Sequence, residues 1–344
     1  MRVVQGNAID LSLFDFDLDL TFAVFFLNAD KTVYGRYGTR SSQKDAQSDI
    51  SLPGFKKALA GALDLHAVFP KVRASLLAKT PPPPRYSRPE LYPSLRRFKP
   101  ELDYKGRVAK SCMHCHMIGV ARRETWRDSG KPLPDRVLYP WPNPSVIGLG
   151  MDPREMATVT SVSPSSPASR AGLRAGDELL SLGCQPLLST ADIQWVLHRS
   201  DDVASIPARI RRGGESRSVT LELERGWRRG DDISWRTTSW DLRRMVTGGM
   251  RLAELSDEGR RERGVDARKL ALLVEHVGQY GEHRTAKNVG FRKGDVIVEW
   301  AGRSDRMRET EIFAIGMKER LPGEKVAVTV LRRGKRIDMK LPMR

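Results

Sequence analysis

The pattern of apolar and polar positions near the start of the chain predicts a β-hairpin followed by a helix. Residues 20–38 contain two apolar-rich runs on either side of a polar turn, which is the pattern of two paired strands. Residues 55–66 then carry apolar side chains at helical spacing, and Ser51 or Pro53 is the expected start of that helix.

The C-terminal half contains an internal repeat. The run from Ala171 to Leu180, AGLRAGDELL, reappears from Val289 to Val298 as VGFRKGDVIV. A second match follows in the same order, because each run is succeeded by alternating strands around an Arg-Arg-Gly turn. Two collinear matches indicate two copies of one unit.

Each copy is predicted to contain strands, a glycine-aspartate turn, a buried strand, a helix and a β-hairpin. The helices are expected at about 189–198 and 309–320. Glycine tolerates positive φ, and an aspartate side chain can accept hydrogen bonds from the backbone of its own turn. The residues assigned to these structural turns are Gly172, Gly176, Asp177, Gly290, Gly294 and Asp295.

The run from Ser166 to Asp177 resembles the signature of PDZ domains of the bacterial HtrA-associated type. In that family the carboxyl terminus of a peptide is added as a strand beside a core strand, and backbone N–H groups of a glycine-containing loop hold its carboxylate. The resemblance implies such loops at 147–151 and 248–252, with helix residues flanking the groove or packing beneath it. The implied peptide-binding residues are Ile147, Gly148, Leu149, Gly150, Met151, Ile193, Val196, Leu197, Gly249 and Met250.

Two alternatives bear on this binding role. The loop glycines could instead form ordinary turns, and residues 278–284 of the second copy depart from the pattern of residues 163–167 in the first. HtrA proteins also carry a serine protease, but neither a Gly-x-Ser-Gly-Gly turn nor a G-x-S-x-G elbow occurs in this chain. We therefore expect peptide binding without proteolysis.

The N-terminal hairpin and helix, with a Phe-Phe-x-Asn-x-Asp turn, resemble the second half of a thioredoxin fold. In that family the redox Cys-x-x-Cys lies upstream, where this chain has only residues 1–14. We expect either an incomplete start or a degenerate remnant, without thiol-disulfide activity from this segment. The whole arrangement resembles a thioredoxin-like/PDZ family of bacterial proteins, some members of which are selenoproteins.

A Cys-x-x-Cys-His motif lies in the Pro-rich segment 81–144. Its spacing is that of covalent c-type haem attachment, in which Cys112 and Cys115 would bond the vinyl groups and His116 would ligate iron. The alternatives are a redox dithiol, a plain structural pair, and a zinc site that would also use His114, although four ligands within five residues suit a tetrahedron poorly. Haem attachment takes place outside the cytoplasm and requires an export signal.

Charge and hydropathy narrow the partners. The formal net charge of +17 favours acidic partners, but the arginines occur in short groups without aromatic interleaving, which argues against a specific nucleic-acid partner. No apolar run approaches the roughly 20 residues of a membrane helix, so no integral membrane segment is expected. The protein is expected in the cell envelope if its start is incomplete, and in the cytoplasm if Met1 is the true start.

Together these patterns predict an α+β multidomain protein. The expected parts are a partial thioredoxin-like segment (1–80), a Pro-rich linker with the Cys-x-x-Cys-His motif (81–144) and two PDZ-like, partly open β-barrels (145–228 and 229–344). The predicted function is non-enzymatic capture of peptide or protein C-termini, or of extended strands, by β-augmentation. The alternative is an extracytoplasmic redox or haem electron-transfer protein that uses its PDZ units for docking.

Overall fold

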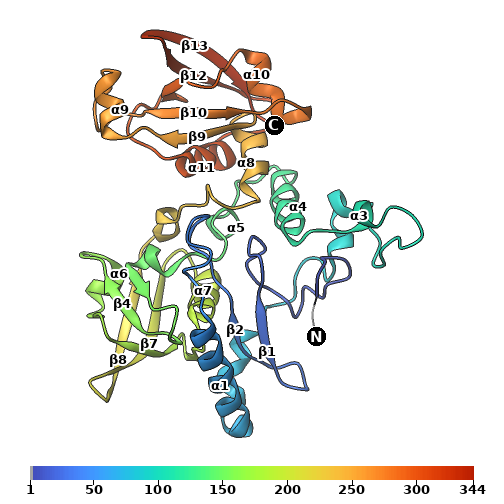
Figure 1. Ribbon diagram of the computed structural model, residues 1–344, viewed down its shortest axis with the longest axis vertical. Helices are drawn as coiled ribbons and strands as arrows, with labels where there is room; N and C mark the ends of the chain where they lie inside the picture. Colours follow the sequence, from blue (N-terminus) through green and yellow to red (C-terminus); the bar gives the residue numbers. More distant parts are fainter. Residues whose placement is uncertain (1–2) are drawn as a thin grey trace. The chain divides into compact units, whose positions relative to one another are not determined.

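The computed structural model describes residues 3–344, which form two compact units (Figure 1). The first unit combines the chain up to Arg122 with Asp135–Asp231, and the second combines Arg123–Pro134 with Asp232–Arg344. Among residues 3–344, no helix has the length and apolar character needed to cross a bilayer.

The N-terminal hairpin and helix are confirmed. Strands β1 (Val24–Leu27) and β2 (Val33–Tyr37) pair antiparallel. Helix α1 (Leu52–Ala67) begins after Ser51, whose side chain accepts a hydrogen bond from the Gly54 N–H and so satisfies one of the free donors at the helix start. Helix α2 (Phe69–Leu76) and the 3-10 turn η1 (Leu77–Lys79) follow.

Most of the segment predicted as a linker packs within the first unit, and its residues Arg123–Pro134 belong to the second unit. Its buried Leu95, Phe98 and Ile118 form a core with Ile9 and Leu11 from the start of the chain. Residues on both sides of the expected boundaries at 80 and 144 therefore lie in one compact unit. The helical elements of this segment are η2 (Pro89–Leu91), η3 (Pro93–Leu95), α3 (Val108–Ser111), α4 (Cys115–Arg127) and α5 (Asp135–Leu138).

The first repeat copy has the predicted order of strands, turn, buried strand, helix and hairpin. Its strands form a pair, β3-β4, and a four-stranded sheet of order β6-β5-β7-β8, and α7 packs its apolar face into the core that they enclose. The bounds are η4 (Pro144–Ile147), β3 (Leu149–Met151), β4 (Val159–Val162), α6 (Pro167–Arg170), β5 (Glu178–Leu182), β6 (Gln185–Pro186), α7 (Thr190–Arg199), β7 (Ala204–Arg212), β8 (Glu215–Leu223) and η5 (Trp227–Gly230).

The second copy repeats that order in a continuous antiparallel sheet, β13-β12-β11-β10-β9, which leaves β9 at an edge. Helix α8, which precedes the first strand of this copy, was not predicted from the sequence. The bounds are α8 (Ser239–Val246), β9 (Met250–Glu254), α9 (Asp257–Glu262), β10 (Leu272–Val277), η6 (Gly281–Arg284), α10 (Thr285–Val289), β11 (Val296–Trp300), α11 (Glu309–Glu319), β12 (Lys325–Arg332) and β13 (Lys335–Pro342).

The glycine-aspartate turns are built alike in the two copies. The Asp177 carboxylate accepts from the Arg174 N–H at 2.8 Å, and both of its oxygens accept from the Arg212 guanidinium at 2.6 and 2.7 Å. The Asp295 carboxylate makes the matching bonds to the Arg292 N–H at 2.9 Å and to Arg332 at 2.6 and 2.7 Å. Bidentate Arg-carboxylate pairs are specific in geometry, so this agreement shows a common local fold.

The turn glycines have the backbone conformation that the aspartate network requires. Gly176 and Gly294, which directly precede the two aspartates, have φ angles of 87° and 91°. Gly172 and Gly290, with φ angles of 76° and 109°, each offer a carbonyl that accepts a further bond from the arginine of their copy. A side chain at these angles would be strained, which explains glycine at these positions.

Candidate functional site

In the first copy, the candidate peptide-accepting edge is strand β3. Its pairing register with β4 aligns Leu149 with Val162 and Gly150 with Ser161, and within residues 3–344 β3 pairs with no other strand. The predicted carboxylate loop leads into this strand: Ile147 and Leu149 are buried in the core, and Gly148 has a φ of 86° at the end of η4. Gly150 and Met151 are partly exposed.

Helix α7 follows β6 in this copy, and its apolar face packs into the domain core. Ile193, Val196 and Leu197 belong to the domain core and are at most 5% exposed. Of the two positions predicted for them, flanking the groove or packing beneath it, this burial in the core favours packing beneath it. Gln194 and His198 lie four residues apart on a neighbouring face of α7, and neither was singled out from the sequence.

Two other parts of the first unit cover Gln194 and His198. The Thr39 hydroxyl donates to Gln194 Oε1 at 2.7 Å, and Gln194 Nε2 donates to the Trp141 carbonyl at 3.3 Å. The Trp141 N–H donates to His198 Nδ1 at 3.3 Å, and the rings of Trp141 and His198 stack with centroids 5.1 Å apart. Gln194 and His198 of α7 are therefore covered by the protein's own chain.

The opposite side of α7 is held by the N-terminal hairpin, and Figure 1 shows β2 beside this helix. The Asp192 carboxylate forms an ion pair with Lys79 Nζ at 2.9 Å and accepts a hydrogen bond from the Arg36 N–H at 3.2 Å, and the Lys79–Asp192 pair is fully buried. The Arg36 guanidinium lies 3.9 Å from the centroid of the Trp195 ring, a cation–π contact. These contacts fix the hairpin to the domain.

Burial controls the protonation state of His198 in α7. The pKa of His198 is lowered to about 3, mainly because the buried imidazolium would lose its hydration. Asp15 acts in the opposite direction, while Arg122 adds to the decrease. His198 is therefore neutral at pH 7, which leaves its Nδ1 free to accept the Trp141 N–H.

In the second copy, α8 fills the space between β9 and α11, and Figure 1 shows α8 and α11 next to β9. Leu242 and Val246 of α8 are buried, and a Cβ atom at Gly316 of α11 would meet Val246 within 2.4 Å. The groove of this copy is thus filled by the helix that precedes it in the chain.

A buried ion pair closes the second groove. The Glu309 carboxylate at the start of α11 accepts from Arg243 Nε at 3.0 Å and from Arg243 Nη2 at 2.5 Å. The same carboxylate accepts from the Leu252 N–H at 2.8 Å, which occupies a backbone donor of the edge strand β9. Burial raises the pKa of Glu309, and the charge and hydrogen bonds of Arg243 oppose that rise.

The predicted loop of the second copy is enclosed as well. Met250 is fully buried, and the Gly249 N–H donates to the Arg243 carbonyl at 2.8 Å. A Cβ atom at Gly249 would come within 1.9 Å of the His283 carbonyl oxygen. Neither Gly249 nor Met250 is presented to a peptide while α8 is in place.

The Cys112–His116 segment packs against the start of the chain. The Met113 side chain is fully buried, its N–H donates to Asn7 Oδ1 and its carbonyl accepts from the Gly6 N–H, both at 2.7 Å. Cys112 and Cys115 are free and partly buried, and burial raises the pKa of the Cys115 thiol. Over the described part of the chain, no group of three or more His, Cys, Asp or Glu residues is arranged to hold a metal ion.

Comparisons with known proteins agree with the repeat-based analysis in the first copy. The PDZ domain family matches residues 145–223. The chain is similar to a probable periplasmic serine endoprotease DegP-like of Marinomonas sp., with 25% identity over 186 residues, 54% of this chain and 37% of the relative. It is also similar to the periplasmic serine endoprotease DegP of Salmonella typhimurium, with 28% identity over 150 residues, 44% of this chain and 27% of the relative.

Two solved structures are also similar over short stretches. The serine endoprotease from Yersinia pestis is 28% identical over 23% of this chain and 29% of that chain, with a TM-score of 0.21. The HtrA3 PDZ domain bound to a phage-derived ligand (FGRWV) is 22% identical over 22% of this chain and 81% of that chain, with a TM-score of 0.19.

Residues 145–223 thus form a PDZ domain with DegP-like, HtrA-type relatives. The chain matches at most 37% of the length of the curated relatives named above. These matches give no support to the thioredoxin-like segment, to the selenoprotein-type family or to a haem or redox centre. They also do not establish a second PDZ domain.

Proposed function

We propose that this chain binds protein or peptide C-termini, or extended strands, through the PDZ domain at 145–223, and that its own residues cover the groove in the unliganded state. The observation that carries the proposal is strand β3, which has a partner on one edge only and therefore has backbone groups available for an added strand. The cover consists of Thr39 and Trp141 on the helix side. A ligand competes with these contacts.

The second copy has a different role in this proposal. We treat it as PDZ-like because it shares the turn network of the first copy, and we infer that α8 and the Arg243–Glu309 pair occupy the positions that a peptide would take. We propose that recognition resides in the first domain and that the second is closed. Because the relatives are named as periplasmic, we propose that this chain is also located in the cell envelope. We assign it no proteolysis, since it carries neither serine nucleophile motif.

Strand addition can be tested with matched variants at Met151. The pairing of β3 with β4 directs the N–H groups of alternate residues outward, and Met151→Pro removes one of these donors from the edge. Peptides from a C-terminal library that bind the wild type should lose at least about tenfold in affinity with Met151→Pro and less than about twofold with Met151→Leu. Equal affinities for all three proteins would disprove strand addition at β3.

The cover can be tested separately with Thr39→Ala. Loss of the Thr39–Gln194 hydrogen bond should weaken the closed state by about 1 kcal/mol and tighten apparent peptide affinity up to about fivefold. Fluorescence anisotropy with a labelled peptide measures this change. A weaker or unchanged affinity, with Met151→Pro still disruptive, would contradict the cover while leaving peptide binding intact.

The alternative function rests on the Cys-x-x-Cys-His motif at the start of α4. The raised pKa of Cys115 disfavours the thiolate on which a reactive dithiol depends. Covalent haem would require Cys112, Cys115 and His116 to face one porphyrin. Expression in a haem-maturing host decides this point: a Soret band that survives acid-acetone extraction supports haem attachment, and a colourless protein removes it.

A further inference from the structure

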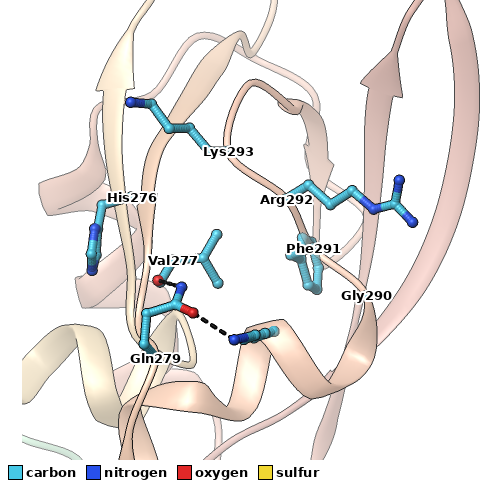
Figure 2. Close-up of a pocket in the computed structure, with 8 residues that line it drawn as sticks. His276, Val277, Gln279, Gly290, Phe291, Arg292 and Lys293 are labelled. Atoms are coloured by element: carbon cyan, nitrogen blue, oxygen red, sulfur yellow. Dashed lines mark hydrogen bonds between the residues drawn. The ribbon is translucent and has the colours of Figure 1, made fainter.

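The second unit contains a cavity of about 420 Å³ at the end of β10, separate from the groove that α8 fills. Its volume falls within the range of roughly 300–1,000 Å³ that is usual for small-ligand sites. Figure 2 shows the side chains of Val277 and Phe291 on opposite sides of it. The lining residues are His276, Val277, Gln279, Lys287, Gly290, Phe291, Arg292 and Lys293.

The floor of this cavity is apolar and its rim is cationic. Val277 and Phe291 are 6% and 2% exposed, so each presents a fixed apolar surface. Lys287, Arg292 and Lys293 are exposed, and no acidic residue lines the cavity. In the part of the chain that the structure describes, none of these three cations forms an ion pair, whereas the nearby Glu275 and Glu282 pair with arginines elsewhere.

One cation of the rim is held in place. The Gln279 amide donates through Nε2 to the Val277 carbonyl and accepts through Oε1 from Lys287 Nζ, and Figure 2 shows both bonds. An ammonium group has three donors, so Lys287 keeps two for a ligand. Figure 2 shows the Lys293 ammonium group beside the strand that carries His276, at the other end of the view from Gln279, whereas the Arg292 guanidinium points away from the cavity.

We propose that this cavity binds a carboxylate attached to an apolar or aromatic group. The Lys287 ammonium group would hold the carboxylate by charge-assisted hydrogen bonds, Lys293 would add electrostatic attraction from the rim, and Val277 and Phe291 would cover the apolar part. This chemistry is shared by the C-terminal residue of a peptide and by a small aromatic acid. The site is independent of strand β3 and therefore of the function proposed above.

N-acetylphenylalanine and its amide are suitable probes, because they differ only in the carboxylate. Titration of the full chain by isothermal calorimetry should give saturable binding of the acid and at least about tenfold weaker binding of the amide. Equal binding of acid and amide, or no saturable binding of the acid up to about 20 mM, would overturn the proposal.

Charge-reversed variants test the assignment of residues. Lys287→Glu with Lys293→Glu should reduce affinity for the acid at least about tenfold. Lys335→Glu with Lys340→Glu makes the same change in net charge at exposed positions of β13 outside the cavity, and should alter affinity less than about twofold. An equal loss in both double variants would reveal nonspecific attraction and refute the site.

A competition arm separates the two sources of the ligand. A pentapeptide ending in phenylalanine that displaces N-acetylphenylalanine, and that loses affinity in the Lys287→Glu, Lys293→Glu variant, identifies the site as one for peptide termini. Binding of the small acid without such displacement identifies a small-molecule site. The Met151→Pro variant should bind the acid normally, so failure at this cavity and failure at β3 are distinguishable.

Discussion

Replacing Arg243 by methionine should destabilise the second unit strongly, because it leaves the Glu309 carboxylate buried without its charge partner. Arg243 and Glu309 are 5% and 3% exposed. Breaking a buried pair from one side typically costs about 3–5 kcal/mol, since the remaining charge cannot be hydrated. After this substitution the Glu309 carboxylate would still accept from the Leu252 N–H.

The matched control is Arg251→Met, which removes an Arg–Glu pair of similar geometry at the surface. Arg251 and Glu275 lie 2.6 Å apart and are 48% and 37% exposed. Exposed pairs contribute about 0–1 kcal/mol, so the two variants should differ by about 2–5 kcal/mol. Burial is the principal difference between the two pairs.

The double variant Arg243→Met, Glu309→Gln tests the origin of the loss. It removes the charge but keeps an acceptor for the Leu252 N–H, so it should recover most of the stability. Native-state hydrogen exchange of peptides from residues 296–320 reports unfolding of the second unit separately from the first. A cost below about 1 kcal/mol for Arg243→Met, or no recovery in the double variant, would refute the reasoning.

The same variant should show a characteristic pH dependence. Burial raises the pKa of Glu309 in the folded state, so its contribution to stability is present below the unfolded pKa and is lost as the pH rises through the folded pKa. Removing Arg243 increases that rise in pKa. The penalty of Arg243→Met should therefore be smaller at pH 5 than at pH 7.

Two further predictions concern a histidine and a glycine. The folded pKa of His198 is depressed to about 3, so its contribution to the free energy of unfolding is present above about pH 6.5 and is lost as the pH falls toward 3, by at most about 1.4 kcal/mol per pH unit. Urea unfolding at pH 7 and pH 5 should therefore show a smaller change in stability with pH for His198→Leu than for the wild type, and equal changes would contradict this. Gly249→Ala should lower stability by several kcal/mol, because the new Cβ atom meets the His283 carbonyl. Gly264→Ala, at a φ of 65° with open space around it, should lower stability by about 1 kcal/mol. Thermal unfolding measures both variants, and equal losses would show that φ alone matters.

Sequence analysis predicted local features well because local residues dictate them. The hairpin at β1-β2, the cap at Ser51 and the helices α7 and α11 follow from alternation, spacing and side-chain oxygens within a few residues. The repeat was visible because its turn needs glycine and aspartate at fixed positions.

The contents of the two grooves could not be predicted in this way. Thr39 and Gln194 are 155 residues apart, and nothing in either local sequence indicates that they meet. Arg243 and Glu309 are ordinary charged residues in the sequence, and only burial between α8 and α11 makes them a pair. The linker assignment for 81–144 also failed because proline content does not reveal that Leu95 and Ile118 pack with the start of the chain.

The sequence by itself determined the repeated segment and its glycine-aspartate turns, because both depend on backbone conformations that particular residues favour within one short segment. The PDZ domain, which the family match places at residues 145–223, was predicted at 145–228 from the resemblance of residues 166–177. Only the tertiary structure decided whether the grooves are open. That outcome depends on burial and on contacts between segments that are distant in the sequence. Thr39 and Trp141 contact α7 in the first copy, and α8 packs beside β9 in the second. The free energy of these contacts is gained only once the whole unit has folded.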